Sequence, residues 1–163
     1  IKAIYPGTFD PITKGHLDII ERSAKIYDHL VIAVMENRGK TCTFDKQARK
    51  QMIEKCLKEI DNVEVIVGEG LTVDIAEKYG CRIIIRGIRA VSDYESELAL
   101  ATANMNLKNN IETVLMVSKP ELSFLSSSIA KEIAYFNGDI SEYIPEAILK
   151  DVSEKLYRKD NQM

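Results

Sequence analysis

A short segment near the start of the chain combines residue types that bind phosphate groups. Segment 6–16 has the sequence PGTFDPITKGH and follows an apolar, β-branched run. Gly7 permits a tight turn and a close approach of the backbone to a ligand, and Thr8 offers a hydroxyl group. Gly15 and His16 fall at the start of the next helix, where free amide groups and the helix dipole favour an anion. An isolated histidine is usually a capping or packing residue, but this convergence on one loop favours phosphate binding.

Lys40 follows a second apolar run and is a candidate for binding an anionic substrate. It lies in Gly39-Lys40-Thr41, which imitates the end of a Walker A loop. The first glycine of that motif is replaced by Val34, and the next helical pattern begins several residues later. A P-loop opens into its helix at once, so we exclude a P-loop NTPase.

Two arginines mark the end of a later apolar run. Arg86 emerges from a strand so apolar that burying it would be costly unless it met an anion, and the planar fork of arginine matches phosphate oxygens. Arg89 follows after three residues. The acids of the next helix are expected to form mainly a solvated first turn: Asp93, Glu95 and Glu97. Serines 126–128 precede a further helix, where they can cap it and also present hydroxyl and amide groups to an anion.

The elements that position these loops alternate along the chain. Apolar, β-branched runs predict strands at 2–5, 29–35, 63–67, 82–85 and 113–117. Helical patterns predict helices at 17–26, 46–60, 72–79, 94–107, 127–136 and 145–158. This order predicts an α/β protein with a doubly wound, five-stranded parallel sheet, in one domain over 1–163. Ligands of such folds bind beyond the carboxyl ends of the strands, where the candidate loops lie.

Composition narrows the class of protein. The 163 residues carry a formal net charge of −3, which argues against nucleic acid as the main partner, so an anionic ligand must be held by a local positive pocket. The three cysteines form no CxxC pair and are expected to be reduced thiols of a cytoplasmic protein. No apolar run reaches the about 18 residues of a membrane span, and no signal peptide is expected.

Three segments together resemble the bacterial phosphopantetheine adenylyltransferase family. Residues 7–11 and 13–16 resemble the (H/T)xGH signature of the nucleotidylyltransferase superfamily. The sequences RGIRAV at 86–91, DYE at 93–95 and FLSSSIAKE at 124–132 narrow the resemblance to this one family, and it runs nearly from end to end. It implies a Rossmann-like nucleotidylyltransferase fold with extra C-terminal helices.

The resemblance also implies an activity and a set of roles. The activity would be reversible transfer of an adenylyl group from ATP to 4′-phosphopantetheine, giving dephospho-coenzyme A and pyrophosphate. His16 would stabilise the transition state, assisted by Lys40 and Arg89. The acceptor would contact Thr8, Lys40, Thr72 and Arg86. ATP would contact Thr8, Phe9, His16, Gly87, Ile88, Arg89, Glu97, Leu122, Ser123, Phe124, Leu125, Ser126, Ser127 and Ser128. Mg²⁺ would accompany ATP with no metal site on the protein itself, and the family implies a homohexamer.

Two departures and two alternatives accompany this interpretation. Leu122 stands where many relatives carry an aromatic residue, and Ser96 replaces a frequent tyrosine. One alternative is a nicotinate mononucleotide adenylyltransferase or cytidylyltransferase of the same superfamily, against which the sequences at 86–91 and 124–132 argue. The other is a non-catalytic nucleotide-binding protein, against which the intact His16 and Lys40 argue.

Overall fold

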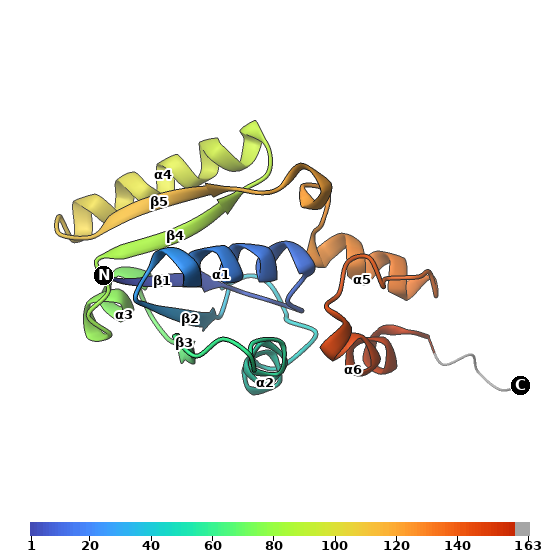
Figure 1. The fold of residues 1–163 in the computed structure, drawn as a ribbon. Coiled ribbons are helices and arrows are strands. Elements are labelled where there is room, and N and C mark those ends of the chain that lie inside the picture. Colours follow the sequence, from blue (N-terminus) through green and yellow to red (C-terminus); the bar gives the residue numbers. More distant parts are fainter. Residues whose placement is uncertain (159–163) are drawn as a thin grey trace, which may run out of the picture.

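Five parallel strands form the centre of the molecule in the computed structural model, which describes residues 1–158 (Figure 1). They are β1 (Lys2–Gly7), β2 (His29–Met35), β3 (Val63–Gly68), β4 (Ile83–Ile88) and β5 (Glu112–Val117). Their order in the sheet is β3-β2-β1-β4-β5, so the chain builds outward from β1 and then crosses back to start β4 on its other side. This confirms the predicted doubly wound sheet. The reversal between β1 and β4 is the switch point at which such sheets bind ligands.

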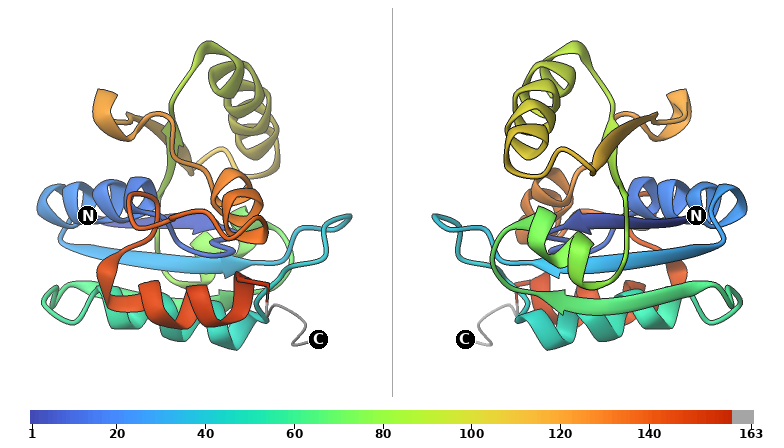
Figure 2. Two further views of the ribbon diagram at one scale, coloured as in Figure 1. Left: turned by 90° about the vertical axis from the view of Figure 1, so that its right-hand side faces the viewer. Right: turned by 90° about the vertical axis from the view of Figure 1, so that its left-hand side faces the viewer.

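The helices lie on both faces of the sheet and beyond its carboxyl end. They are α1 (Lys14–Ile26), α2 (Lys46–Cys56), α3 (Thr72–Lys78), α4 (Val91–Leu107), α5 (Ser127–Tyr135) and α6 (Glu146–Leu156), with a 3₁₀ turn, η1 (Pro120–Leu122), before α5. Figure 2 shows α1 and α4 on opposite sides of the sheet. Figure 1 shows α5 and α6 beyond the strand ends, with α6 next to α2.

The central strands are largely apolar because both of their faces are covered. Ala3 and Tyr5 of β1 belong to the core cluster that includes side chains of α1, α2 and α6. Ile4, between them, belongs to the cluster that includes side chains of α3. Alternate residues of a strand point to opposite faces, so one strand serves two cores. No helix within residues 1–158 is long and apolar enough to cross a membrane.

Several element ends differ from the sequence-based prediction, and two differences affect the site. The helix expected to start at 17 begins at Lys14, because the Thr13 hydroxyl caps it by accepting a hydrogen bond from the His16 amide. β4 runs three residues beyond the expected end, because its pairing with β5 continues to Ile88. Arg86 therefore lies within β4 and not after it. The polar tail 159–163, expected to fray, lies outside the described residues.

Two further differences are shifts at helix ends. The helix expected over 94–107 begins at Val91, and the one expected over 46–60 ends at Cys56. Asp45 caps this second helix: its carboxylate accepts a hydrogen bond of 2.8 Å from the Ala48 amide. These shifts of a few residues at helix ends leave the order and faces of the elements as predicted.

Candidate active site

A cavity of about 590 Å³ lies where β1 and β4 separate. These strands pair only at Ala3–Ile83 and Ile4–Ile84, although both continue for several residues. β4 stays paired with β5 to its end, so β1 and β4 diverge and leave a space at the switch point. Its walls come from the loop between β1 and α1, the loop after β2, the β4–α4 junction and the segment from β5 to α5.

Most of the predicted site residues line this cavity. They are Thr8, Phe9, His16, Lys40, Arg86, Gly87, Arg89, Glu97, Leu122, Leu125, Ser126, Ser127 and Ser128. Four others do not: Thr72, Ile88, Ser123 and Phe124. Thr72 is the first residue of α3, and the half-exposed ring of Phe124 packs edge-on against Tyr143 with 5.6 Å between centroids.

The His16 ring is held in one orientation by the start of α1. Its Nδ1 accepts a hydrogen bond of 3.1 Å from the Thr13 amide, which completes a capping box. The Phe9 ring packs against it edge-on, with 5.1 Å between centroids. Because Nδ1 accepts, the single proton of the neutral ring is on Nε2. The ring therefore offers one hydrogen-bond donor beyond its own capping box.

The charge state of His16 follows from its surroundings. Burial lowers the pKa of His16 from 6.5 to about 4, and the positive charges of Arg89 and Arg86 act in the same direction. Near pH 7 the imidazole is therefore neutral, so it can serve as a hydrogen-bond donor but adds no positive charge of its own to the cavity.

Phe9 packs against the His16 ring and has a backbone conformation that is unusual for its residue type. Its φ is 50°, and its side chain is 2% exposed. A Cβ atom at position 7 would lie 2.8 Å from the Phe9 Cζ atom. Glycine is thus required at 7 to admit the Phe9 ring, a reason that differs from the close ligand approach inferred from the sequence. The Phe9 ring belongs to the hydrophobic core.

Arg86 is already paired in this structure. Its Nε and Nη2 donate to the two oxygens of Glu97 at 2.7 and 2.8 Å, and Nη1 donates to the Pro6 carbonyl at 2.9 Å. The anion that compensates this half-buried arginine is thus a carboxylate of the same chain. Most of the acids of this helix were expected in a solvated first turn, which is wrong for Glu97, because its side chain is only 14% exposed. The guanidinium keeps two further N–H groups that these bonds do not use.

Arg89 bridges two of the cavity walls. Its Nε donates to Asp93 at 3.2 Å, and its Nη1 donates to the Leu125 carbonyl at 2.7 Å. Burial would raise the pKa of Asp93, but the hydrogen bonds from Arg89 outweigh it and hold this pKa below its usual value. Asp93 thus orients the arginine, and the expectation of a solvated acid at this position was also wrong.

Lys40 contrasts with both arginines. It lies in an exposed turn, in which its backbone amide donates to the Asn37 carbonyl at 3.2 Å and Gly39 has a φ of 98°. Within residues 1–158 its ammonium group forms no ion pair and no hydrogen bond. Its donors remain available to a ligand.

Three polar residues near the cavity were not found from the sequence as site residues. Asp10 and Lys131 line it and form an ion pair, with 3.0 Å between Oδ2 and Nζ. Arg49 of α2 is only 2% exposed and donates to backbone carbonyls. Asp10 and Lys131 lie inside the segments that carried the family resemblance, so the sequence could have identified them as site residues. Arg49 gave none, because an arginine in a polar helix is usually solvated.

Comparisons with known proteins identify the family and the fold of this chain. The cytidylyltransferase-like family model matches residues 4–133. A phosphopantetheine adenylyltransferase from Finegoldia magna is 50% identical over 97% of this chain and 98% of its own length, and one from Lachnoclostridium phytofermentans is 48% identical over 98% of each. A solved structure from Vibrio parahaemolyticus, assigned as a nicotinate-nucleotide adenylyltransferase, covers 97% of this chain and 95% of its own with a TM-score of 0.71. At 19% identity, that likeness shows a common fold.

Proposed function

The chain belongs to the phosphopantetheine adenylyltransferase family, within the cytidylyltransferase-like proteins, and from this premise we propose how its cavity carries out the reaction. It is a nucleotidyltransferase that moves the adenylyl group of ATP to 4′-phosphopantetheine in coenzyme A biosynthesis, giving dephospho-coenzyme A and pyrophosphate. One observation carries the proposal: a neutral imidazole donor, a free lysine and two oriented arginines meet at one cavity.

The acceptor supplies its own nucleophile. A phosphate monoester has a second pKa of about 6, so it is ionised near neutral pH and needs no general base. One of its oxygens attacks the α-phosphorus of ATP in line. A bond forms from that oxygen to the α-phosphorus, and the bond from the α-phosphorus to the bridging oxygen breaks. Pyrophosphate leaves with the electron pair. Catalysis then consists of positioning the two phosphates and neutralising the charge that develops.

Each cavity residue has a role that fits its surroundings. His16 donates its Nε2 proton in a hydrogen bond to an oxygen of the α-phosphoryl group, and Thr8 adds a hydroxyl donor on the same loop. Arg89 and Lys40 neutralise charge around that group. Arg86 and Lys40 hold the acceptor phosphate, with Arg86 using the N–H groups that Glu97 leaves free. The assignment of Arg86 to the acceptor phosphate is supported by its bidentate pair with Glu97, because this pair fixes the orientation of the guanidinium group.

ATP occupies the side of the cavity formed by the segment from β5 to α5. The Ser126 hydroxyl caps α5 by accepting from the Ile129 amide at 3.1 Å, while Leu122 lines the cavity with an apolar side chain. Where many relatives carry an aromatic residue, Leu122 thus offers an aliphatic contact in place of a flat stacking surface. Ser96 lies exposed on α4 and hydrogen-bonds to the Ser92 carbonyl at 3.4 Å, so that departure affects the surface of the helix.

Magnesium would enter with ATP, held by the triphosphate and water, and would neutralise charge on the leaving pyrophosphate. The state of the acidic side chains in the cavity supports this. Asp93 and Glu97 are engaged by Arg89 and Arg86, and Asp10 is engaged by Lys131 and two backbone amides. A metal ion bound by any of these carboxylates would have to replace a partner already present.

The protein would work in the cytoplasm as a homohexamer, as its family implies. Three free thiols suit a reducing compartment.

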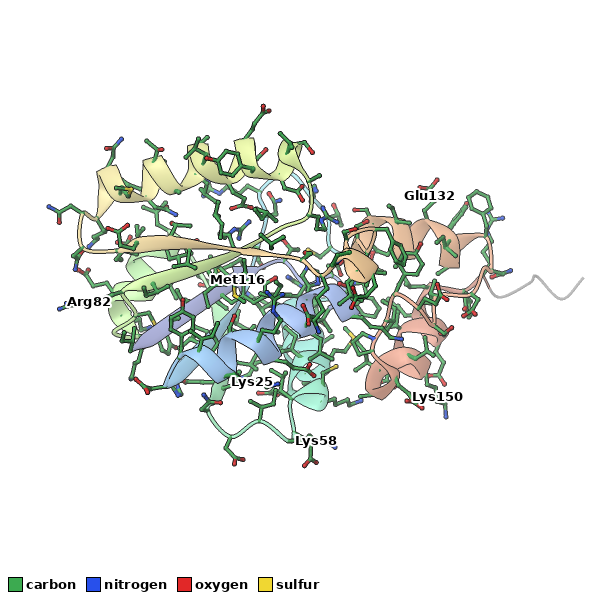
Figure 3. All side chains as sticks on the ribbon, turned by 45° about the horizontal axis from the view of Figure 1, so that its top comes forward. Lys25, Lys58, Arg82, Met116, Glu132 and Lys150 are labelled. Atoms are coloured by element: carbon green, nitrogen blue, oxygen red, sulfur yellow. The ribbon has the colours of Figure 1, made fainter. Side chains whose placement is uncertain are left out.

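Assembly is supported by α4, whose outward side chains stand clear of the sheet in Figure 3. Its exposed apolar residues are Val91, Tyr94, Leu98, Leu100, Met105 and Leu107. Light scattering in solution tests this assembly, and a monomeric mass would contradict it.

The acceptor assignment is tested by product analysis with three acceptors. ATP labelled at the α-phosphate is incubated with 4′-phosphopantetheine, with nicotinate mononucleotide or with pantetheine, and the products are identified by mass spectrometry. We expect adenylylation of 4′-phosphopantetheine alone, because pantetheine lacks both the nucleophile and the group that Lys40 and Arg86 hold. A nicotinate dinucleotide formed at a comparable rate would overturn the acceptor assignment, and no transfer to any acceptor would overturn the activity itself.

A further inference from the structure

The loop that carries Lys40 is attached to the rest of the protein at its base only. It comprises residues 36–43, between the end of β2 at Met35 and Phe44, and residues 36–41 are all exposed. Within the described residues the loop has one internal backbone hydrogen bond, which closes the short turn at Asn37–Lys40. The position of Lys40 over the cavity therefore depends on whatever holds the two ends of the loop.

Arg49 of α2 joins these two ends. Its Nη1 donates to the Met35 carbonyl at 3.0 Å, where the loop leaves, and its Nε donates to the Phe44 carbonyl at 3.0 Å, where it returns. Nη1 also donates to the Thr8 carbonyl at 2.7 Å. A buried guanidinium needs partners for its donors, and here all the partners are main-chain carbonyls of segments that border the cavity. The side chain is 2% exposed and does not line the cavity.

Asp10 binds main-chain amides where the same loop ends, whereas Arg49 binds main-chain carbonyls. Its Oδ2 accepts a hydrogen bond of 2.8 Å from the Thr43 amide, and its Oδ1 accepts one of 2.9 Å from the Phe44 amide. Oδ2 also accepts from Lys131 Nζ of α5 at 3.0 Å. The carboxylate is 5% exposed. One buried acid thus joins the Lys40 loop, the first loop and the helix on the ATP side of the cavity.

We propose that Asp10 and Arg49 are positioning residues that together set the place of Lys40 relative to the α-phosphate site. We call the pair the loop clamp. The clamp acts through the main chain at Met35 and residues 43–44, the two ends of the loop, and its bond to the Thr8 carbonyl ties these ends to the first loop, so that the ammonium of Lys40 is held at a set place relative to that loop. This inference rests on the proposed function only for the role of Lys40 in holding the acceptor; the geometry of the clamp is independent of it.

The clamp predicts a kinetic effect that depends on Lys40. Arg49→Lys keeps the charge but places its donors on one nitrogen, so it cannot reach all three carbonyls. We expect the KM for 4′-phosphopantetheine to rise about tenfold, while the KM for ATP changes less than about twofold. In a Lys40→Ala background the same change should raise the acceptor KM by less than about twofold, because the clamp acts through that lysine. An equal proportional rise in both backgrounds would overturn the proposal.

Asp10→Asn is the second variant, because Arg49 variants can fail to fold. An amide cannot accept from both main-chain amides and from Lys131 at once, so the returning end of the loop is released. The acceptor KM should again rise only when Lys40 is present. Matched controls are Lys50→Met, a half-exposed neighbour of Arg49 on α2, and Glu132→Gln on the outer side of α5 (Figure 3). Both controls should leave both KM values unchanged.

Amide hydrogen exchange of the ligand-free protein tests the clamp without the reaction. In Asp10→Asn the amides of Thr43 and Phe44 should exchange at least about tenfold faster than in the wild type, while those of α6 keep their protection. Unchanged exchange at 43–44 would overturn the clamp even if the enzyme were fully active. Conversely, faster exchange in a protein that does not adenylylate phosphopantetheine would overturn the proposed function and leave the clamp in place.

Discussion

The cavity has two regions that differ in how their functional side chains are held. On the rim formed by the β1–α1 loop and β4, His16, Arg86 and Arg89 are each held by a neighbouring side chain or main-chain group. On the loop 36–43, Lys40 is exposed and held only through its backbone. The polar groups of the rim are thus held by partners in this structure, whereas the ammonium group of Lys40 has no such partner within residues 1–158.

The rim and the loop use their polar groups in different ways. A donor fixed in advance needs no reorganisation when charge develops, so its full effect appears in the transition state. A flexible lysine loses rotamer freedom on binding, which offsets part of what its charge contributes. We therefore expect rim variants to lower turnover or to disturb the fold, and loop variants to weaken acceptor binding with the fold intact.

The largest expected effect is that of His16→Ala. This variant removes the Nε2 donor of the rim, and the loss of one such donor typically lowers kcat by about 10²–10³-fold. ATP affinity should fall far less, because the donor acts mainly on charge that develops during transfer. Pyrophosphate release measures kcat, and calorimetry measures ATP binding. Near-normal turnover with weakened ATP binding would show that His16 is a ground-state contact, and the rim would then not differ from the loop.

Glu97→Gln tests whether the carboxylate holds Arg86 in place. The variant leaves a half-buried guanidinium without its compensating charge, so the free energy of unfolding should fall by about 1–3 kcal/mol. The KM for the acceptor should rise about tenfold, because the guanidinium is no longer fixed by two parallel hydrogen bonds. Urea unfolding and steady-state kinetics measure the two effects. Glu95→Gln, at an exposed neighbouring position, is the control. An unaltered acceptor KM would mean that Arg86 is only structural.

Lys40→Ala should separate binding from stability. Removing this ammonium should weaken acceptor binding about tenfold, as expected for one charge-assisted contact. The melting temperature should stay within about 1 °C of the wild type, because an exposed side chain without partners adds little stability. Calorimetry with each ligand and a thermal melt measure the two quantities. If the weakening were confined to ATP, Lys40 would belong to the nucleotide side of the cavity.

The same contrast explains what the sequence could and could not predict. The first loop was found because its residues are contiguous and Thr13 caps the helix that carries His16, so local chemistry determines the geometry. The sheet order followed from alternating strands and helices. The pairing of Arg86 with Glu97 joins residues on two elements, and no local pattern specifies it. Arg49 was missed for the same reason, since two of its three partner carbonyls, those of Thr8 and Met35, lie in segments distant along the chain.

The smallest expected effect concerns how the rim responds to pH. The pKa of His16 is lowered to about 4 in the folded protein, from 6.5 for an unhindered histidine. As pH falls below 6.5 the unfolded chain takes up a proton at this residue that the folded chain does not. Stability due to this group is therefore lost as pH falls from about 6.5 to about 4. At pH 5 the loss relative to pH 7 should be about 1–2 kcal/mol.

His16→Gln isolates this contribution, because glutamine does not titrate and can still accept the Thr13 amide in a capping box. The melting temperatures of the wild type and of this variant are compared at pH 7 and at pH 5, so that the acids common to both proteins cancel. We expect the wild type to lose about 3–6 °C more than the variant between these pH values. Lys40→Ala should lose as much as the wild type, since this variant keeps His16. Parallel losses in the wild type and His16→Gln would mean that His16 is protonated in the free enzyme, and the rim would then carry a third cation where the geometry indicates a neutral donor.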